Sequence, residues 1–204
     1  MNGMKRGVNL KTKSLQIQDY INIGLFTALY FVTMFMTGVV IKLIPVLIIA
    51  MPTIIGSVCG IIYMLFVSKV KKRGMILIMA IILGGLMSLI SGIWLILITS
   101  LISGVTAEIV SGMGKYKKSN YLIAGYSFFN CWSLGAMLTI WLYRDWFLKK
   151  MEDTGGARYA ELIKRFTPNW MIFIVILGAL FGGLFGGIIG KKVLHKHFVK
   201  GGLI

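Results

Sequence analysis

Long apolar stretches separated by short polar runs, most of them basic, make up almost the whole of this chain. A helix needs about 20 predominantly apolar residues to cross a bilayer. On this basis we expect six membrane-spanning helices, at about residues 20–41, 45–68, 74–91, 92–113, 120–144 and 168–190. The third and fourth should form a hairpin at residues 88–92, because their combined run is too long for one crossing at a rise of about 1.5 Å per residue. The pattern predicts an all-α, polytopic six-helix bundle.

Composition supports a membrane protein and excludes a large soluble domain. The 204 residues are 57% hydrophobic and only 14% charged, whereas soluble domains carry about 25% charged residues. We expect one transmembrane domain over residues 20–193, preceded by a cytoplasmic segment at 1–19 and followed by a basic cytoplasmic tail at 194–204.

Basic residues set the expected orientation. The net charge of +16 is spread over the ends of the apolar spans and does not form one patch, which argues against nucleic-acid binding. By the positive-inside rule, both termini are expected in the cytoplasm of a multi-pass protein of the cell membrane. The cations on the expected inner side are Lys5, Arg6, Lys11, Lys13, Lys69, Lys71, Lys72, Arg73, Lys115, Lys117, Lys118, Lys191, Lys192, Lys196 and Lys200.

The longest connection, residues 145–167, is then expected outside. It reads as two short helical pieces broken at Gly155-Gly156. In the second piece Tyr159, Leu162, Ile163 and Phe166 recur at helical spacing and predict one apolar face. This connection is either a surface segment or a mobile cover over an outward-facing pocket.

The sequence carries no motif of an enzyme. It contains no HExxH, GxSxG or Walker A pattern, and Cys59 and Cys131 are expected to be packing residues. We therefore expect no catalytic activity, no cofactor and no metal. Glu108 is the one acidic residue well within a span, which makes it a functional candidate. Pairing with Lys115 or Lys117, a contact with a neighbouring chain and a proton-coupling role all remain open for it.

The fifth span carries the best candidate for a ligand site. At about 100° per residue, Asn130, Ser133, Met137, Trp141 and Arg144 fall within an arc of about 80° on one helix. Amide, indole and guanidinium groups in such a stripe could hold a small planar or anionic molecule. A seam between two helices is the alternative. Residues expected to complete the site are Trp94, Asn169 and Trp170.

Glycines recur at every fourth position of the last span, at Gly178, Gly182, Gly186 and Gly190. Glycine costs about 1 kcal/mol against alanine inside a helix, but in lipid a ridge of small residues lets another backbone approach closely. The ridge is therefore expected to mediate close helix packing, and Gly182→Leu should reduce folded yield or transport.

Three features together resemble a known family: "QDYINIGLFTALYFV" at the first span, "GKKVLHKHFVKGGL" after the last, and six spans in about 200 residues. They resemble the substrate-binding S components of energy-coupling factor (ECF) transporters, specifically the Trep_Strep family of integral membrane proteins. The resemblance implies a bundle that captures a vitamin or similar micronutrient outside. It also implies partners, namely a transmembrane coupling subunit and two ATPases that drive inward release.

In S components, small residues spaced AxxxA on the first helix contact the coupling subunit. The matching positions here are Gly24 and Ala28, with glycine in place of the first alanine. The resemblance adds a second interpretation of the glycine ridge, as an outer face that slides against the coupling subunit. The competing functions are a stand-alone secondary transporter or channel that uses Glu108, and a membrane scaffold without a ligand.

Overall fold

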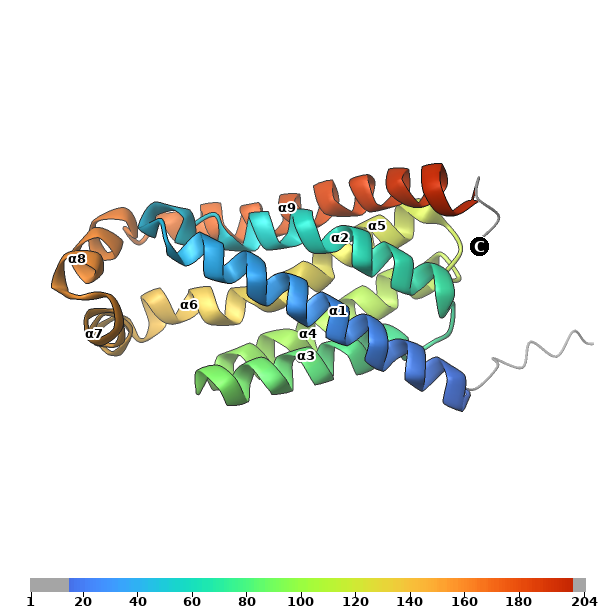
Figure 1. The fold of residues 1–204 in the computed structure, drawn as a ribbon, viewed down its shortest axis with the longest axis horizontal. Helices are drawn as coiled ribbons and strands as arrows, with labels where there is room; N and C mark the ends of the chain where they lie inside the picture. The colour runs from blue at the N-terminus through green and yellow to red at the C-terminus, as the bar shows by residue number, and fades with distance from the viewer. Residues whose placement is uncertain (1–14, 200–204) are drawn as a thin grey trace, which may run out of the picture.

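Long helices run side by side along the molecule, and two short helices lie at one end (Figure 1). The computed structural model describes residues 15–199, except for the side chains of Lys42, Pro45, Val46 and residues 197–199. The helices that run along the molecule are α1 (Ile17–Lys42), α2 (Met51–Lys69), α3 (Met75–Ser91), α4 (Trp94–Met113), α5 (Ser119–Asn130), α6 (Leu134–Leu142) and α9 (Met171–Val193). The helices at one end are α7 (Arg144–Gly155) and α8 (Ala157–Phe166), and the remaining turns are η1 (Pro45–Ile48), η2 (Cys131–Ser133) and η3 (Leu194–Val199).

The structure confirms an all-α protein with several membrane-length helices. Among the described residues, α1, α2, α4 and α9 are long and apolar enough to cross a membrane. Helix α3 is equally apolar but has 17 residues. The fifth predicted span is divided into α5, the 3₁₀ turn η2 and α6. The chain is therefore a multi-pass membrane protein.

Two glycines with positive φ form the breaks that the sequence predicts. Helix α3 ends at Ser91, Gly92 has a φ of 72° and α4 begins two residues later. Gly156, with a φ of 84°, separates α7 from α8. Glycine adopts these left-handed conformations without the steric penalty that other residues incur.

The glycine ridge of α9 packs against α2 inside the bundle. A Cβ atom built on Gly182 would lie 2.5 Å from the carbonyl oxygen of Thr53, and one on Gly190 would lie 2.6 Å from that of Gly60. Gly186 meets the backbone of Gly56 at even closer range. Because Gly56 and Gly60 are themselves four residues apart, two glycine ridges face each other. This is the first of the two expected arrangements, and it leaves these α9 glycines buried.

Helix α5 is held to this pair by interhelical hydrogen bonds. Tyr126 Oη donates to the carbonyl oxygen of Gly56 (2.7 Å), and Ser127 Oγ donates to that of Leu180 (2.7 Å). Asn130 Nδ2 donates to both Pro52 O (2.9 Å) and Ala179 O (2.8 Å). Such bonds strengthen helix association in lipid, where the hydrophobic effect does not drive it.

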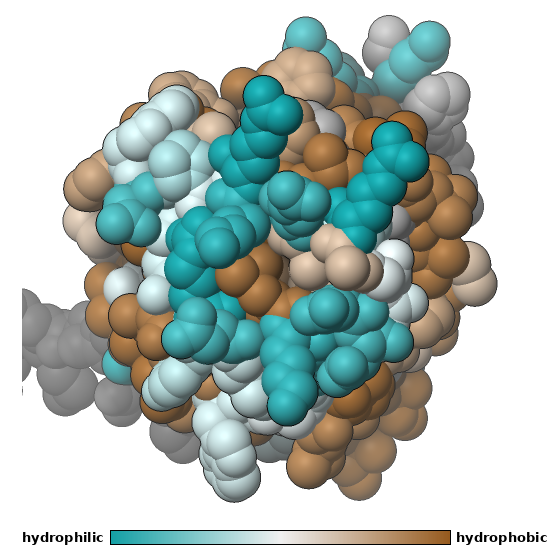
Figure 2. Space-filling model, turned by 90° about the vertical axis from the view of Figure 1, so that its left-hand side faces the viewer, coloured by the Kyte–Doolittle hydropathy of each residue, from teal (hydrophilic) through white to brown (hydrophobic). Residues whose placement is uncertain are grey.

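The two ends of the bundle differ in charge. The start of α1, the α2–α3 and α4–α5 connections and the end of α9 share one end, which we call the basic end (Figure 1). Its described cations are Lys69, Lys71, Lys72, Arg73, Lys115, Lys117, Lys118, Lys191, Lys192 and Lys196. The expected inner cations Lys5, Arg6, Lys11, Lys13 and Lys200 lie outside the described residues. The opposite end holds α7 and α8, and hydrophilic side chains gather on it above an apolar flank (Figure 2).

We predict that Gly182→Leu destabilises the fold, because its side chain would overlap the α2 backbone at Thr53. Overpacking costs about 1–3 kcal/mol and more where backbones must separate. Yield of monodisperse protein and thermal unfolding in detergent measure the effect. Gly85→Leu is the matched control, since a Cβ atom there meets no atom within 4 Å. Equal stability of the two variants would contradict this account of the ridge.

Candidate functional site

A cavity of about 380 Å³ lies at the α7 end of the bundle, between α1, α2, α3, α4, the η2–α6 segment and α7. Its lining is mainly apolar and rich in methionine. The lining methionines are Met34, Met51, Met87, Met137 and Met151. Methionine is flexible and polarisable, so it adapts to ligands of different outline. A concave, largely apolar chamber with few polar groups is the usual form of a small-molecule site.

The η2 turn brings Trp132 and Ser133 to the cavity wall. The turn interrupts the fifth apolar stretch, and the carbonyl oxygen of Trp132 accepts a hydrogen bond from Thr99 Oγ1 of α4 (3.0 Å). Close packing of Gly135 against Ile96 and Thr99 holds α6 against α4. The Trp132 indole is 3% exposed, and its Nε1 has no hydrogen-bond partner among the described residues.

Helix α7 closes one side of the cavity, and its Lys150 is the one charged residue in the lining among the side chains that the structure describes. Phe147 is buried there, and Lys150 Nζ donates to the carbonyl oxygen of Ser91 (2.9 Å) at the end of α3. The same ammonium lies 4.8 Å from the centre of the Trp146 ring. This arrangement places a cation and an indole side by side at the wall.

The chemistry of the cavity suits a molecule with an apolar or planar body and one anionic group. Thioether and indole groups would contact the body, and the Lys150 ammonium would pair with the anion.

Of the residues predicted for the ligand site, Ser133 and Met137 line this cavity. Asn130 does not, because its side chain is fully buried and bonds α5 to α2 and α9. Trp141 and Arg144 do not line it either: Trp141 Nε1 donates to Pro168 O (3.1 Å), and Arg144 Nη1 donates to Thr167 O (3.0 Å). The predicted stripe assumed one continuous helix, whereas η2 interrupts it and Arg144 begins α7.

The three residues expected to complete the site lie outside this cavity. Trp94 is 76% exposed and Trp170 is 58% exposed, and Asn169 is exposed beside it. The two indoles are positioned near the α7 end of α4 and α9, as interfacial tryptophans of membrane helices usually are.

Sequence reasoning missed the α7 residues of the cavity. Trp146, Phe147, Lys150 and Met151 recur at positions i, i+1, i+4 and i+5, which marks one face of a helix. The other four methionines, Met34, Met51, Met87 and Met137, come from four other elements, and no local pattern shows that they meet.

Glu108 caps the start of α3. Its carboxylate accepts hydrogen bonds from the backbone amides of Gly74 (2.6 Å), Ile76 (3.0 Å) and Leu77 (3.3 Å), and from the hydroxyl of Tyr116. Anions are stabilised at helix N-termini by the free amides and the helix dipole. Burial and the neighbouring Glu108 carboxylate raise the pKa of Tyr116 well above its usual range, so this phenol stays protonated as a donor.

The Glu108 carboxylate faces a basic cleft of about 640 Å³, which Lys71, Lys72, Arg73 and Lys115 also line. Pairing with Lys115 or Lys117 was one of the roles left open for Glu108, but the partners that the structure gives it are backbone amides and a phenol.

On α1, Gly24 and Ala28 are exposed on the outer surface, and a Cβ atom at Gly24 would meet no atom within 4 Å. No metal-binding group of three or more His, Cys, Asp or Glu side chains occurs among residues that the structure describes. Cys59 and Cys131 are free thiols.

A comparison with protein families gives a match over nearly the whole chain. The model for "Hypothetical bacterial integral membrane protein (Trep_Strep)" matches residues 17–200. No curated protein and no solved structure gives a significant match. The match begins at the first residue of α1 and extends just beyond η3. The membrane bundle and its α7 cavity thus both fall within it, and the chain belongs to the Trep_Strep family of bacterial integral membrane proteins.

Proposed function

We propose that this protein is the substrate-binding subunit, or S component, of an ECF-type importer. One observation carries the proposal: a ligand-sized cavity lies at the end of the bundle opposite to the basic end. A binding subunit that takes its cargo from outside needs its chamber at the outer end. The positive-inside rule assigns the basic end to the cytoplasm.

The proposed topology has six crossings. Helix α3, at 17 residues, spans about 26 Å at 1.5 Å per residue, close to the bilayer core of about 30 Å. The α5–η2–α6 segment forms the fifth crossing, with its break satisfied inside the bundle by Thr99. Six crossings put both termini on the cytoplasmic side, in agreement with the start of α1 and the end of α9, which share the basic end (Figure 1).

The proposed energy source is a separate module. The chain carries no nucleotide-binding motif, so the proposal requires a coupling subunit and two ATPases. Gly24 and Ala28 present an exposed small-residue surface on α1, and such a surface permits close approach of a partner helix. The α9 glycines are not available for this contact because they face α2.

Helix α7 is proposed as the cover of the site. It lines the cavity, and its Lys150 bond to Ser91 O joins it to the α3–α4 hairpin. Release of this bond would open the cavity to the outer side. The proposed cargo has an apolar or planar body with one anionic group, a description that includes several vitamins.

The alternative, a stand-alone secondary transporter coupled through Glu108, has weaker support. A coupling carboxylate must exchange its proton or ion, but this one is held by three amides and a phenol. A structural role as the cap of α3 accounts for its place in the membrane.

We predict that the chain copurifies from its host with a coupling subunit and two ATPases, and that Gly24→Leu reduces this association at least about tenfold. The added side chain would hold a partner helix away, while the bundle has open space for it. Affinity purification with quantitative mass spectrometry is the measurement. Gly85→Leu, which also adds a side chain in open space on another helix, should leave association unchanged. If the chain purified from its host without any ATPase, the proposal would be contradicted.

A second prediction concerns the cavity. Gly38→Leu should reduce cargo binding about tenfold or more, because Gly38 lines the cavity and its nearest neighbour is the flexible end of Met51, at 3.4 Å from a built Cβ atom. Lys150→Gln should also weaken binding, by about the tenfold expected for one lost charge pair. Native mass spectrometry of protein purified from its host detects the retained cargo. Lys149→Gln removes a neighbouring exposed charge and should retain it; equal loss in both lysine variants would count against the site.

The Glu108→Gln variant distinguishes the proposed binding subunit from the alternative secondary transporter. We expect the purified chain alone to show no ATP-independent uptake in liposomes, with or without this substitution. We expect the variant to unfold more easily by about 1–2 kcal/mol, because α3 loses a charged cap. Uptake by the wild-type chain alone that the substitution abolishes would favour the secondary transporter.

A further inference from the structure

The positive charge at the basic end is not balanced within the chain. The protein has six acidic residues, and Asp145, Glu152, Asp153 and Glu161 lie on α7 and α8 at the other end. The remaining two are already engaged: Asp19 accepts a bond from Lys72 Nζ (2.5 Å), and Glu108 caps α3. No acidic residue of the chain is therefore assigned to the lysines at the end of α9, and their ammonium groups are free to attract anions from outside the chain.

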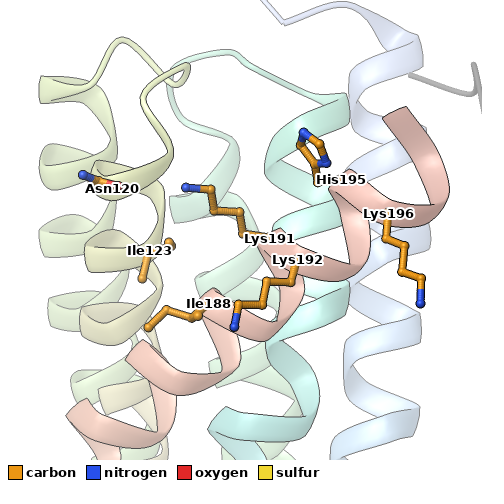
Figure 3. A pocket seen from close by; sticks show the side chains of 7 residues that line it. All are labelled: Asn120, Ile123, Ile188, Lys191, Lys192, His195 and Lys196. Carbon is orange, nitrogen blue, oxygen red and sulfur yellow. The ribbon is translucent and has the colours of Figure 1, made fainter. Parts of the chain in front are cut away.

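A groove of about 500 Å³ lies between the end of α9 and the start of α5. Lys191 extends from α9 towards the α5 side of the groove, where Asn120 lies (Figure 3). Lys192 follows Lys191 on α9. The side chains of Asn120, Lys191 and Lys192 are all exposed. Lys191 and Asn120 thus present donors on the α5 side of the groove, and Lys192 presents its ammonium beside Ile188 (Figure 3). Among the described residues, the lining of this groove includes no acidic side chain.

The floor of the same groove is apolar. Ile123 of α5 and Ile188 of α9 lie below the lysines, towards the middle of the bundle (Figure 3). At about 100° per residue, positions 181, 185, 188 and 192 of α9 fall within an arc of about 60°. Phe181, Phe185 and Ile188 on this face are 63%, 59% and 42% exposed. One continuous apolar track therefore leads from the membrane-facing side of α9 to Lys192.

We propose that this α5–α9 groove binds an anionic phospholipid, with the headgroup phosphate between Lys191, Lys192 and Asn120. One acyl chain would follow Ile188, Phe185 and Phe181. Free phosphate would contact the amines but would leave the apolar track empty. An acidic protein segment would not fill the track either, because the track faces the bilayer. Lysines near an anionic lipid surface strengthen such binding by electrostatic attraction.

The test compares two double variants of the full-length protein in detergent. Lys191→Gln with Lys192→Gln removes two charges from the groove. Lys117→Gln with Lys118→Gln removes two exposed charges from the same end without altering the groove lining. Native mass spectrometry would follow titration with dioleoyl phosphatidylglycerol, and dioleoyl phosphatidylcholine serves as the neutral lipid.

We expect the groove variant to bind phosphatidylglycerol about tenfold more weakly than wild type and the control variant to bind it within twofold of wild type. Phosphatidylcholine should bind weakly to all three proteins, and neither inorganic phosphate nor glycerol 3-phosphate at millimolar concentration should displace the lipid. Equal weakening in both double variants would assign the effect to diffuse charge and overturn the proposal. Displacement by the soluble phosphates would overturn the lipid assignment. If the groove variant kept its lipid binding but lost copurifying subunits, the lipid proposal would be overturned in favour of a protein partner.

Discussion

The close approach of α2 and α9 is the contact on which the rest of the bundle depends. Gly56 and Gly60 on one helix meet Gly186 and Gly190 on the other, so the backbones pack without intervening side chains. In lipid, separated helices are already surrounded by apolar groups, and association relies on packing and hydrogen bonds. This pair also presents the carbonyl oxygens that Tyr126, Ser127 and Asn130 of α5 bind. The position of α5, and through η2 that of the cavity wall, follows from it.

The two ends of the bundle are specialised by charge and by structure. The basic end carries short turns and a carboxylate that is used to cap a helix. The other end carries α7 and α8, which hold four acidic side chains among their cations, and α7 lines a methionine-rich chamber. Apolar pockets with an adaptable lining suit capture of a small molecule. The polar cover provides the interface with water that the membrane-facing flanks do not (Figure 2).

Hydropathy and glycine spacing predicted the fold well because both act locally. The lengths of the apolar runs predicted where helices lie, and the residues at 88–92 and Gly155-Gly156 predicted where helices end. The site was predicted less well. A single-helix wheel placed Asn130 and Arg144 beside Met137, but the η2 turn changes the phase and sends Asn130 to the α2–α9 seam. The cavity combines residues from six regions of the chain, and contacts of that kind leave no periodic signal in one segment. The facing ridge on α2, GSVCG, was visible in the sequence as two glycines four positions apart.

The capping of α3 by Glu108 has a mechanical consequence. The Glu108 carboxylate on α4 bonds to Gly74 in the α2–α3 turn and to Tyr116 in the α4–α5 turn. These hydrogen bonds hold the three elements together at the basic end. At its far tip the α3–α4 hairpin meets α7 through the Lys150 bond to Ser91 O. The α3–α4 hairpin is thus anchored at both ends, by Glu108 at its base and by Lys150 at its tip. If α7 covers the site as proposed, loss of the Lys150 bond would release the tip while Glu108 still holds the base.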